Sequence, residues 1–154
     1  MAKSMKPTLI KALLLVALAA TAMPSLAGRF RQPIYITNAY FCNELKNNDG
    51  NLQPDRVFNV MKANEEKLRA AFVMNLVADK GTHSLEVDLM NNKAEKIDTI
   101  KLQPVEASEN DFAYTAVAMF GGSMPLGGVF FKIYDAVDGG RRRPVGTVRL
   151  MTAE

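Results

Sequence analysis

Clusters of turn-forming residues divide most of this chain into short apolar runs, and this punctuation constrains the fold more than any other feature. Glycine, asparagine, aspartate and proline gather at 47–51, 80–81, 91–92, 121–128 and 138–140. These residues accept a positive φ or fix a sharp bend, so they end regular elements. Short runs between such clusters favour β-strands over long helices.

Several of the runs alternate between apolar and polar residues. Within 83–90 one side of the run carries His83, Leu85, Val87 and Leu89, and the other carries Ser84, Glu86, Asp88 and Met90. This period of two is typical of a strand with one buried face. The β-branched and aromatic run 129–134 and the run 145–151 are joined by a glycine-bearing loop, so they predict a hairpin near the C-terminus.

Further runs have strand composition without clear alternation. Residues 34–42 and 112–120 are rich in aromatic and apolar residues, which fit a pleated surface. Ile100 and Leu102 predict a short strand at about 100–102. It ends before Pro104, because proline has no N–H to donate to a ladder of hydrogen bonds. The charged interval 106–111 is predicted to be an exposed loop.

The segment 62–80 fits either a helix or a strand. Asn64 could cap a helix, since glutamates follow it and a lysine closes the segment. Against this reading, 69–78 is apolar on both faces, and 79–81 has the composition of a three-residue hairpin loop with glycine in the left-handed conformation. We therefore predict a strand at 69–78, with at most one short helix near 62–68.

About seven short strands predict an all-β domain at 28–154, a single antiparallel β-sandwich. The chain is 48% hydrophobic and 23% charged, which is ordinary for a globular protein. A domain of this length buries roughly two thirds of its unfolded surface, so a core can stabilise it without crosslinks.

Three motifs resemble small exported bacterial β-sandwich domains of unassigned function, of the immunoglobulin or fibronectin type. They are Asp-Gly-Asn-Leu at 49–52 before Val-Phe at 57–58, Gly-Thr-His-Ser-Leu-Glu-Val at 81–87, and Leu-Gly-Gly-Val-Phe-Phe-Lys-Ile-Tyr at 126–134. The resemblance covers most of 33–151. It implies a fold, and it brings no catalytic residues.

The segment 1–27 has the pattern of a secretory signal peptide. Lysines at 3, 6 and 11 surround the start of an apolar run at 12–20, and Pro-Ser-Leu-Ala follows at 24–27. This pattern predicts cleavage after Ala27 and export to the bacterial periplasm or beyond. The apolar run is about half of the ~20 residues that span a bilayer, so we expect no transmembrane anchor after cleavage.

The net charge of the chain comes from this signal. The chain has 19 lysines and arginines, 16 aspartates and glutamates, and a formal charge of +3. Three of the basic residues and none of the acidic ones lie in 1–27, so 28–154 carries 16 of each sign. Nucleic acid binding needs a concentrated basic surface, so we expect no nucleic acid partner.

Cys42 is the single cysteine of the chain, so no intramolecular disulfide is expected. Its neighbours Tyr40 and Phe41 are large, which predicts a buried thiol with a raised pKa. An intermolecular disulfide through Cys42 is the second interpretation, and a catalytic nucleophile is the least favoured.

Metal and cofactor chemistry has little support in the sequence. One histidine, His83, and one cysteine do not supply the three or four ligands of a zinc site. The loop 47–51 lacks the closing glutamate of a calcium loop, and the methionines outside the signal are dispersed, which favours core packing over copper binding. We expect no metal and no cofactor.

Arg141, Arg142 and Arg143 form the sharpest local motif. Three guanidinium groups in a hairpin loop could bind an anionic partner through paired hydrogen bonds, although a solvated loop that protects the hairpin edge explains them as well.

The sequence as a whole predicts an exported, non-catalytic protein that contacts a protein partner in the cell envelope. The alternative is a small-ligand carrier or hydrolase-type enzyme. Its site would be assembled by the fold around His83, Tyr114 or carboxylates.

Overall fold

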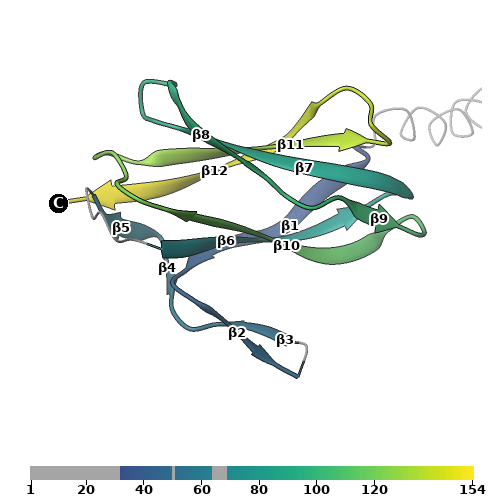
Figure 1. The fold of residues 1–154 in the computed structure, drawn as a ribbon, viewed down its shortest axis with the longest axis horizontal. Helices are drawn as coiled ribbons and strands as arrows, with labels where there is room; N and C mark the ends of the chain where they lie inside the picture. Colours follow the sequence, from purple (N-terminus) through teal and green to yellow (C-terminus); the bar gives the residue numbers. More distant parts are fainter. Residues whose placement is uncertain (1–31, 50, 64–68) are drawn as a thin grey trace, which may run out of the picture. The chain divides into compact units, whose positions relative to one another are not determined.

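The computed structural model describes residues 32–49, 51–63 and 69–154, of which Pro33–Glu154 belong to one compact unit (Figure 1). These ranges contain strands, turns and loops, and no helix. The all-β prediction is therefore confirmed. The predicted signal peptide lies outside the described residues, and of the predicted helix near 62–68 only Lys62 and Ala63 are described. Lys62 ends a strand.

The strands of this unit are β1 (Ile34–Cys42), β2 (Leu45–Asn48), β3 (Asn51–Pro54), β4 (Val57–Phe58), β5 (Val60–Lys62), β6 (Arg69–Ala78), β7 (Gly81–Met90), β8 (Lys96–Lys101), β9 (Val105–Ala107), β10 (Phe112–Gly121), β11 (Val129–Val137) and β12 (Arg143–Ala153). The long strands match the predicted runs, including the strand at 69–78 that competed with a helix. The shorter strands raise the number above the seven predicted.

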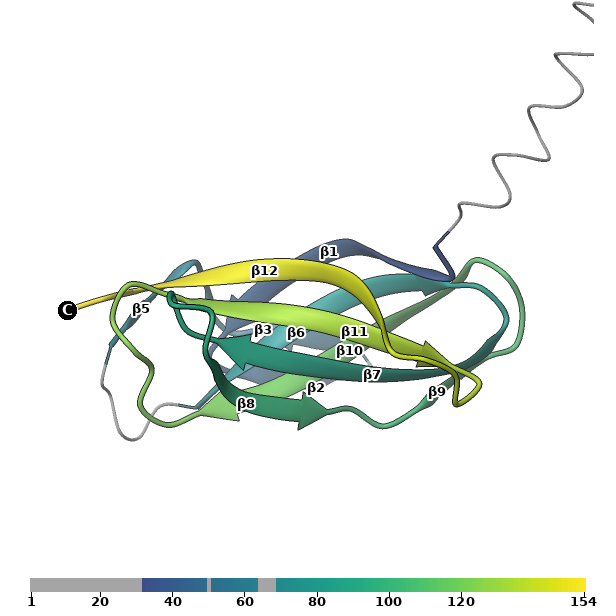
Figure 2. The same ribbon diagram turned by 90° about the horizontal axis from the view of Figure 1, so that it is seen from above.

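Two larger sheets lie over one another in a β-sandwich-like arrangement (Figure 1). One has the order β10-β6-β1-β4, and the other has the order β5-β12-β11-β7-β8, with β9 paired to β7. Figure 2 shows β12, β11, β7 and β8 side by side across the second sheet. The predicted terminal hairpin is confirmed, since β11 and β12 pair antiparallel.

The core lies between these sheets, and four phenylalanines form its centre. Phe41 and Phe72 come from the four-stranded sheet and lie with their ring centroids 4.9 Å apart. Phe131 comes from β11 of the other sheet, and its ring centroid is 4.9 Å from that of Phe41 and 5.0 Å from that of Phe120. Because rings from both sheets meet here, burial of these side chains joins the two layers.

The predicted hairpin between 69–78 and 83–90 is wrong. β6 and β7 belong to different sheets, so the residues between them cross from one layer to the other. Gly81 has φ of 144°, outside the left-handed helical region that the prediction assumed. A Cβ at this position would lie 3.1 Å from Val137 Cγ1, so the connection needs glycine for space as well as for conformation.

Two further details differ from the predicted antiparallel sandwich. β5 pairs with β12 in parallel. The predicted loop at 106–111 begins inside strand β9, where Ala107 is buried against the core. The three residues of β9 are too few to show an alternating pattern, so the sequence did not reveal this strand.

Candidate functional site

Arg142, the middle residue of the predicted anion-binding motif, is engaged by the sheet itself. Its Nε lies 3.2 Å from Glu86 Oε2, and its Nη2 lies 2.7 Å from Asp88 Oδ2. The guanidinium also stacks over the ring of Tyr134, with its carbon 3.7 Å from the ring centroid. These contacts engage the Nε and Nη2 donors and one flat face of the guanidinium.

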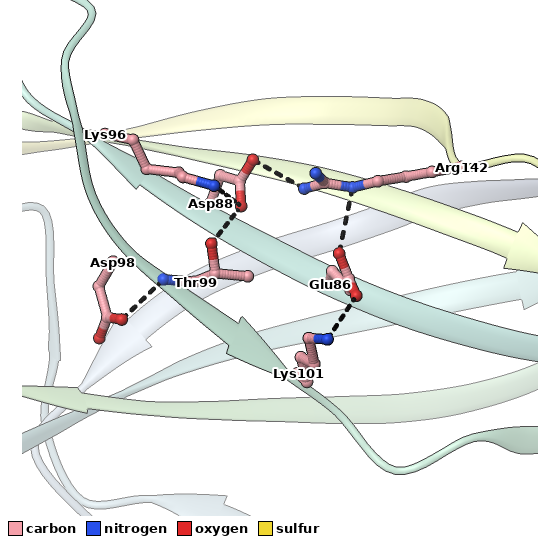
Figure 3. A network of polar contacts seen from close by, with 7 residues as sticks. All are labelled: Glu86, Asp88, Lys96, Asp98, Thr99, Lys101 and Arg142. Carbon is pink, nitrogen blue, oxygen red and sulfur yellow. Dashed lines mark hydrogen bonds and ion pairs between the residues drawn. The ribbon is translucent and has the colours of Figure 1, made fainter.

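Arg142 bridges Glu86 and Asp88 in the middle of a polar network on the outer face of β7 and β8 (Figure 3). Lys101 lies 3.6 Å from Glu86, and Lys96 lies 3.9 Å from Asp88. Oppositely charged side chains on neighbouring strands attract one another, so these charges of the solvated face are paired within the protein.

Asp88 is the most enclosed member of this network, with 6% of its surface exposed. Burial alone raises the pKa of Asp88. Hydrogen bonds from Thr99 and Arg142, together with the positive charges of Arg142 and Lys96, outweigh burial and hold the pKa below its ordinary value. The Thr99 hydroxyl donates to Asp88 Oδ1 at 2.7 Å.

We expect Asp88 to make stability fall in acid. Its carboxyl has a lower pKa in the folded chain than in the unfolded chain. Its ionised form therefore stabilises the fold above pH of about 4, and this contribution is lost as the pH falls through the folded-state value. Urea unfolding at neutral and acidic pH should show a smaller decrease in stability for Asp88→Asn than for the wild type. Glu109→Gln, at an exposed position outside the network, should keep the wild-type decrease; equal slopes for all three proteins contradict the assignment.

Arg141 and Arg143 have exposed side chains. Within the described part of the chain neither forms an ion pair. The binding of an anionic partner by this loop stays a prediction, and it now depends on these two residues, because Arg142 is held by Glu86 and Asp88.

His83, the one histidine, lies in a buried pair with Asp135. The two residues are 1% and 2% exposed, and His83 Nδ1 lies 2.8 Å from Asp135 Oδ2. His83 Nε2 lies 2.8 Å from the backbone oxygen of Asp79. That oxygen can only accept, so Nε2 carries a hydrogen, and a second proton must lie between Nδ1 and the carboxylate. The pair is therefore neutral overall whichever atom holds this proton.

Tyr114 completes this buried cluster from the opposite sheet. Its hydroxyl and Asp135 Oδ1 are both buried, and neither has a hydrogen-bond partner among the described residues. Burial raises the pKa of Tyr114, and the charge of Asp135 raises it further. The structure thus places Tyr114 within electrostatic reach of Asp135, the carboxylate that contacts His83.

The sequence did not identify Asp135, although a signal for it exists. It follows Val129, Phe131 and Ile133 at every second position of β11, all facing the core. An acidic residue in that register must be paired inside the protein. Asp135 occupies a position where the pattern of β11 predicts a buried apolar residue. This exception could have suggested that Asp135 is the partner of a buried His83.

Most of the outer face of the four-stranded sheet is uncharged, and Arg69, opposite Gly121 at the start of β6, is its charged residue among the described strands. Its outward residues form four cross-strand rows, and the register gives them as Tyr35–Val77–Ala113, Asn38–Asn75–Thr115, Tyr40–Val73–Val117 and Cys42–Ala71–Met119. None of these is Asp, Glu, Lys or Arg. We call this set the uncharged face. It contrasts with the ion-paired outer face of the other sheet.

Part of the uncharged face is open and part is covered. Tyr35 and Met119, at diagonally opposite corners, are 41% and 58% exposed. Cys42 is fully buried in a small cluster against which Leu45 of β2 packs. Burial raises the pKa of the Cys42 thiol, so the predicted buried thiol is confirmed.

Sequence and structure comparisons give distant similarities. No protein-family model matches this chain, and no curated protein shows significant similarity to it. Among solved structures, the C-terminal domain of Wzt has a TM-score of 0.48 at 11% identity, over 80% of this chain and 75% of that domain. The Northeast Structural Genomics Consortium target SoR45 has a TM-score of 0.40 at 10% identity, over 80% of this chain and 89% of that one.

Proposed function

We propose that this chain is an exported, non-catalytic β-sandwich protein of the immunoglobulin or fibronectin type. It acts in the periplasm or outside the cell by binding a protein partner of the cell envelope. The binding surface is the uncharged face, and the partner presents an apolar, uncharged surface of its own. No helix in the described ranges is long and apolar enough to cross a membrane.

The observation that carries this proposal is the difference between the two outer faces. A sheet face in contact with water normally alternates polar residues with buried apolar ones, as β7 does with Glu86 and Asp88. The uncharged face has no charged residue in any of its four rows, yet Tyr35 and Met119 reach solvent. Exposed apolar surface of this kind marks sites of protein contact, where charged residues are depleted and aromatic residues and methionine are enriched.

The alternative, a small-ligand carrier or hydrolase-type enzyme, has weaker support. A general base needs a ring nitrogen that can reach a substrate. Both ring nitrogens of His83 already have partners, and its side chain is closed off from solvent. These contacts favour a structural role for the buried cluster.

A crosslinking pull-down from envelope extract tests the proposal. Tyr35→Glu places a carboxylate on the uncharged face, and Thr147→Glu places one at an exposed position on the outer face of the other sheet. Tyr35→Glu should lower capture of the partner about tenfold, because binding would bury an unpaired charge. Thr147→Glu should leave capture unchanged.

Comparing the two variants shows which outer face binds the partner. Equal capture by Tyr35→Glu and the wild type would remove the uncharged face as the binding surface. A wild-type protein that captures nothing, even at micromolar concentration, would argue against the contact function itself. Circular dichroism of both variants confirms that their strands are intact.

A further inference from the structure

The ends of the two larger sheets differ in how they are protected against pairing with another strand. β4 and β5 are two and three residues long, and β9 has three. β8 is longer, but it carries Lys96, Asp98 and Lys101. β10 has ten residues, Phe-Ala-Tyr-Thr-Ala-Val-Ala-Met-Phe-Gly, with no charge and no proline.

An edge strand exposes a row of unpaired backbone donors and acceptors. Natural proteins protect such edges by short length, charge, proline or a bulge. Within the described residues β10 pairs only with β6, and that pairing is regular from Phe112 to Gly121 without a bulge. Its free side therefore lacks these four protections, and a second strand can pair with it.

We propose that β10 pairs antiparallel with β10 of a second copy of this chain, around a two-fold axis centred on Ala116. Two copies related by such an axis use the same surface. Facing residues must point to the same side of the sheet, and alternate residues do so. The axis must therefore pass through a residue and not between two residues. Centring it on Ala116 pairs 112–120 with itself.

The side chains fit this register. On the outer side Ala113 faces Met119 of the second copy, and Thr115 faces its Val117. On the core side Tyr114 faces Ala118, so a large residue lies beside a small one. At each end of the pairing Phe112 faces Phe120, an aromatic pair. Centring the axis on Val117 also gives an aromatic pair, Tyr114 with Phe120, but it places Ala113 opposite Gly121 and Ala116 opposite Ala118, and these small residues bury little surface. The register on Ala116 gives the better packing.

Charge also favours a second copy at β10 over one at β8. Self-pairing of β10 places no like charges opposite each other, because the strand has none. β8 has lysine at both ends and aspartate between, and the polar network of Figure 3 already engages its lysines. We therefore expect the second copy to pair with the four-stranded sheet, at β10, and not with β8 of the other sheet.

This dimer joins the two four-stranded sheets into one and places two uncharged faces side by side. If the proposed function holds, the dimer is bivalent toward its partner, which raises its apparent affinity. Dimerisation itself does not depend on that function, because it requires only β10.

Sedimentation velocity of the purified protein, without any partner, tests the dimer and its register. The wild type should sediment as a dimer at micromolar concentration. Ala113→Lys with Met119→Lys places like charges opposite each other twice across the axis, and both positions are exposed in the single chain. This double variant should raise the dimer dissociation constant about tenfold or more. Ala113→Glu with Met119→Lys places opposite charges in the same pairs, so it should restore the dimer.

Each outcome supports or overturns the inference. A wild-type protein that is monomeric over the whole range overturns it, and so does a double-lysine variant that dimerises like the wild type. A charge-swapped variant that stays monomeric overturns the register centred on Ala116. Tyr35→Glu lies on β1, away from this edge, and should sediment like the wild type even though it lowers partner capture.

Discussion

Replacing Asp135 with alanine should lower the free energy of unfolding by about 3–5 kcal/mol. The carboxylate is the partner of His83 Nδ1 at 2.8 Å, and both residues are closed off from water. Its removal leaves a buried ring nitrogen that must either lose its proton or keep an uncompensated charge. Urea unfolding followed by circular dichroism at neutral pH measures the loss.

Two conservative variants separate the paired interaction from general disruption. Asp135→Asn supplies an amide N–H that can donate to an unprotonated Nδ1, while Nε2 still donates to the Asp79 backbone oxygen, so it should be much less destabilising than Asp135→Ala. Tyr114→Phe removes a hydroxyl that has no hydrogen-bond partner in the described part of the chain, so stability should change by less than about 1 kcal/mol or increase.

A double-mutant cycle then measures the coupling. The effects of His83→Ala and Asp135→Ala should be strongly non-additive, because the second change removes a group that already lacks its partner. Additive effects, or a cost below about 1 kcal/mol for Asp135→Ala alone, would mean that the pair contributes little to the fold.

The strands that sequence predicted best are those with one face buried and one face in water. β7 has this pattern because its inward residues pack in the core while Glu86 and Asp88 join the polar network. β6 is apolar on both faces for a different reason. Its inner residues pack in the core, and Val73 and Val77 lie on the uncharged face. The same feature that made helix and strand hard to separate at 69–78 thus marks the surface proposed to bind a partner.

Apart from the terminal hairpin of β11 and β12, sequence did not predict which strands pair. The residues after β6 have the composition of a turn, and this composition fits a tight hairpin as well as a connection between two sheets. Only the pairing of β6 with β1 and β10, which are distant in sequence, shows that the connection runs between sheets. The clusters of the candidate site depend on the same information. Arg142 meets Glu86 and Asp88, and His83 meets Asp135, because β7 and β11 pair in one register. Residues more than fifty positions apart in sequence give no local signal of such contact.

The largest effect on the core should come from Phe131→Ala, which we expect to cost about 3–5 kcal/mol of stability. Phe131 is fully buried, and its ring lies against rings from the opposite sheet, with centroids 4.9 Å from that of Phe41 and 5.1 Å from that of Phe72. Alanine leaves a cavity at the contact between the two layers, and the packed neighbours can only partly close it.

Phe130 is the matched control, because it is the same residue type one position earlier on the same strand. It points to the outer face, where Arg149 lies over its ring at 5.2 Å from the centroid. Phe130→Ala should therefore cost about 1 kcal/mol or less. Urea unfolding of both variants compares the two faces of β11 directly. If Phe130→Ala costs as much as Phe131→Ala, the stabilising contacts of β11 are not concentrated between the sheets, and the core does not lie where the phenylalanine rings meet.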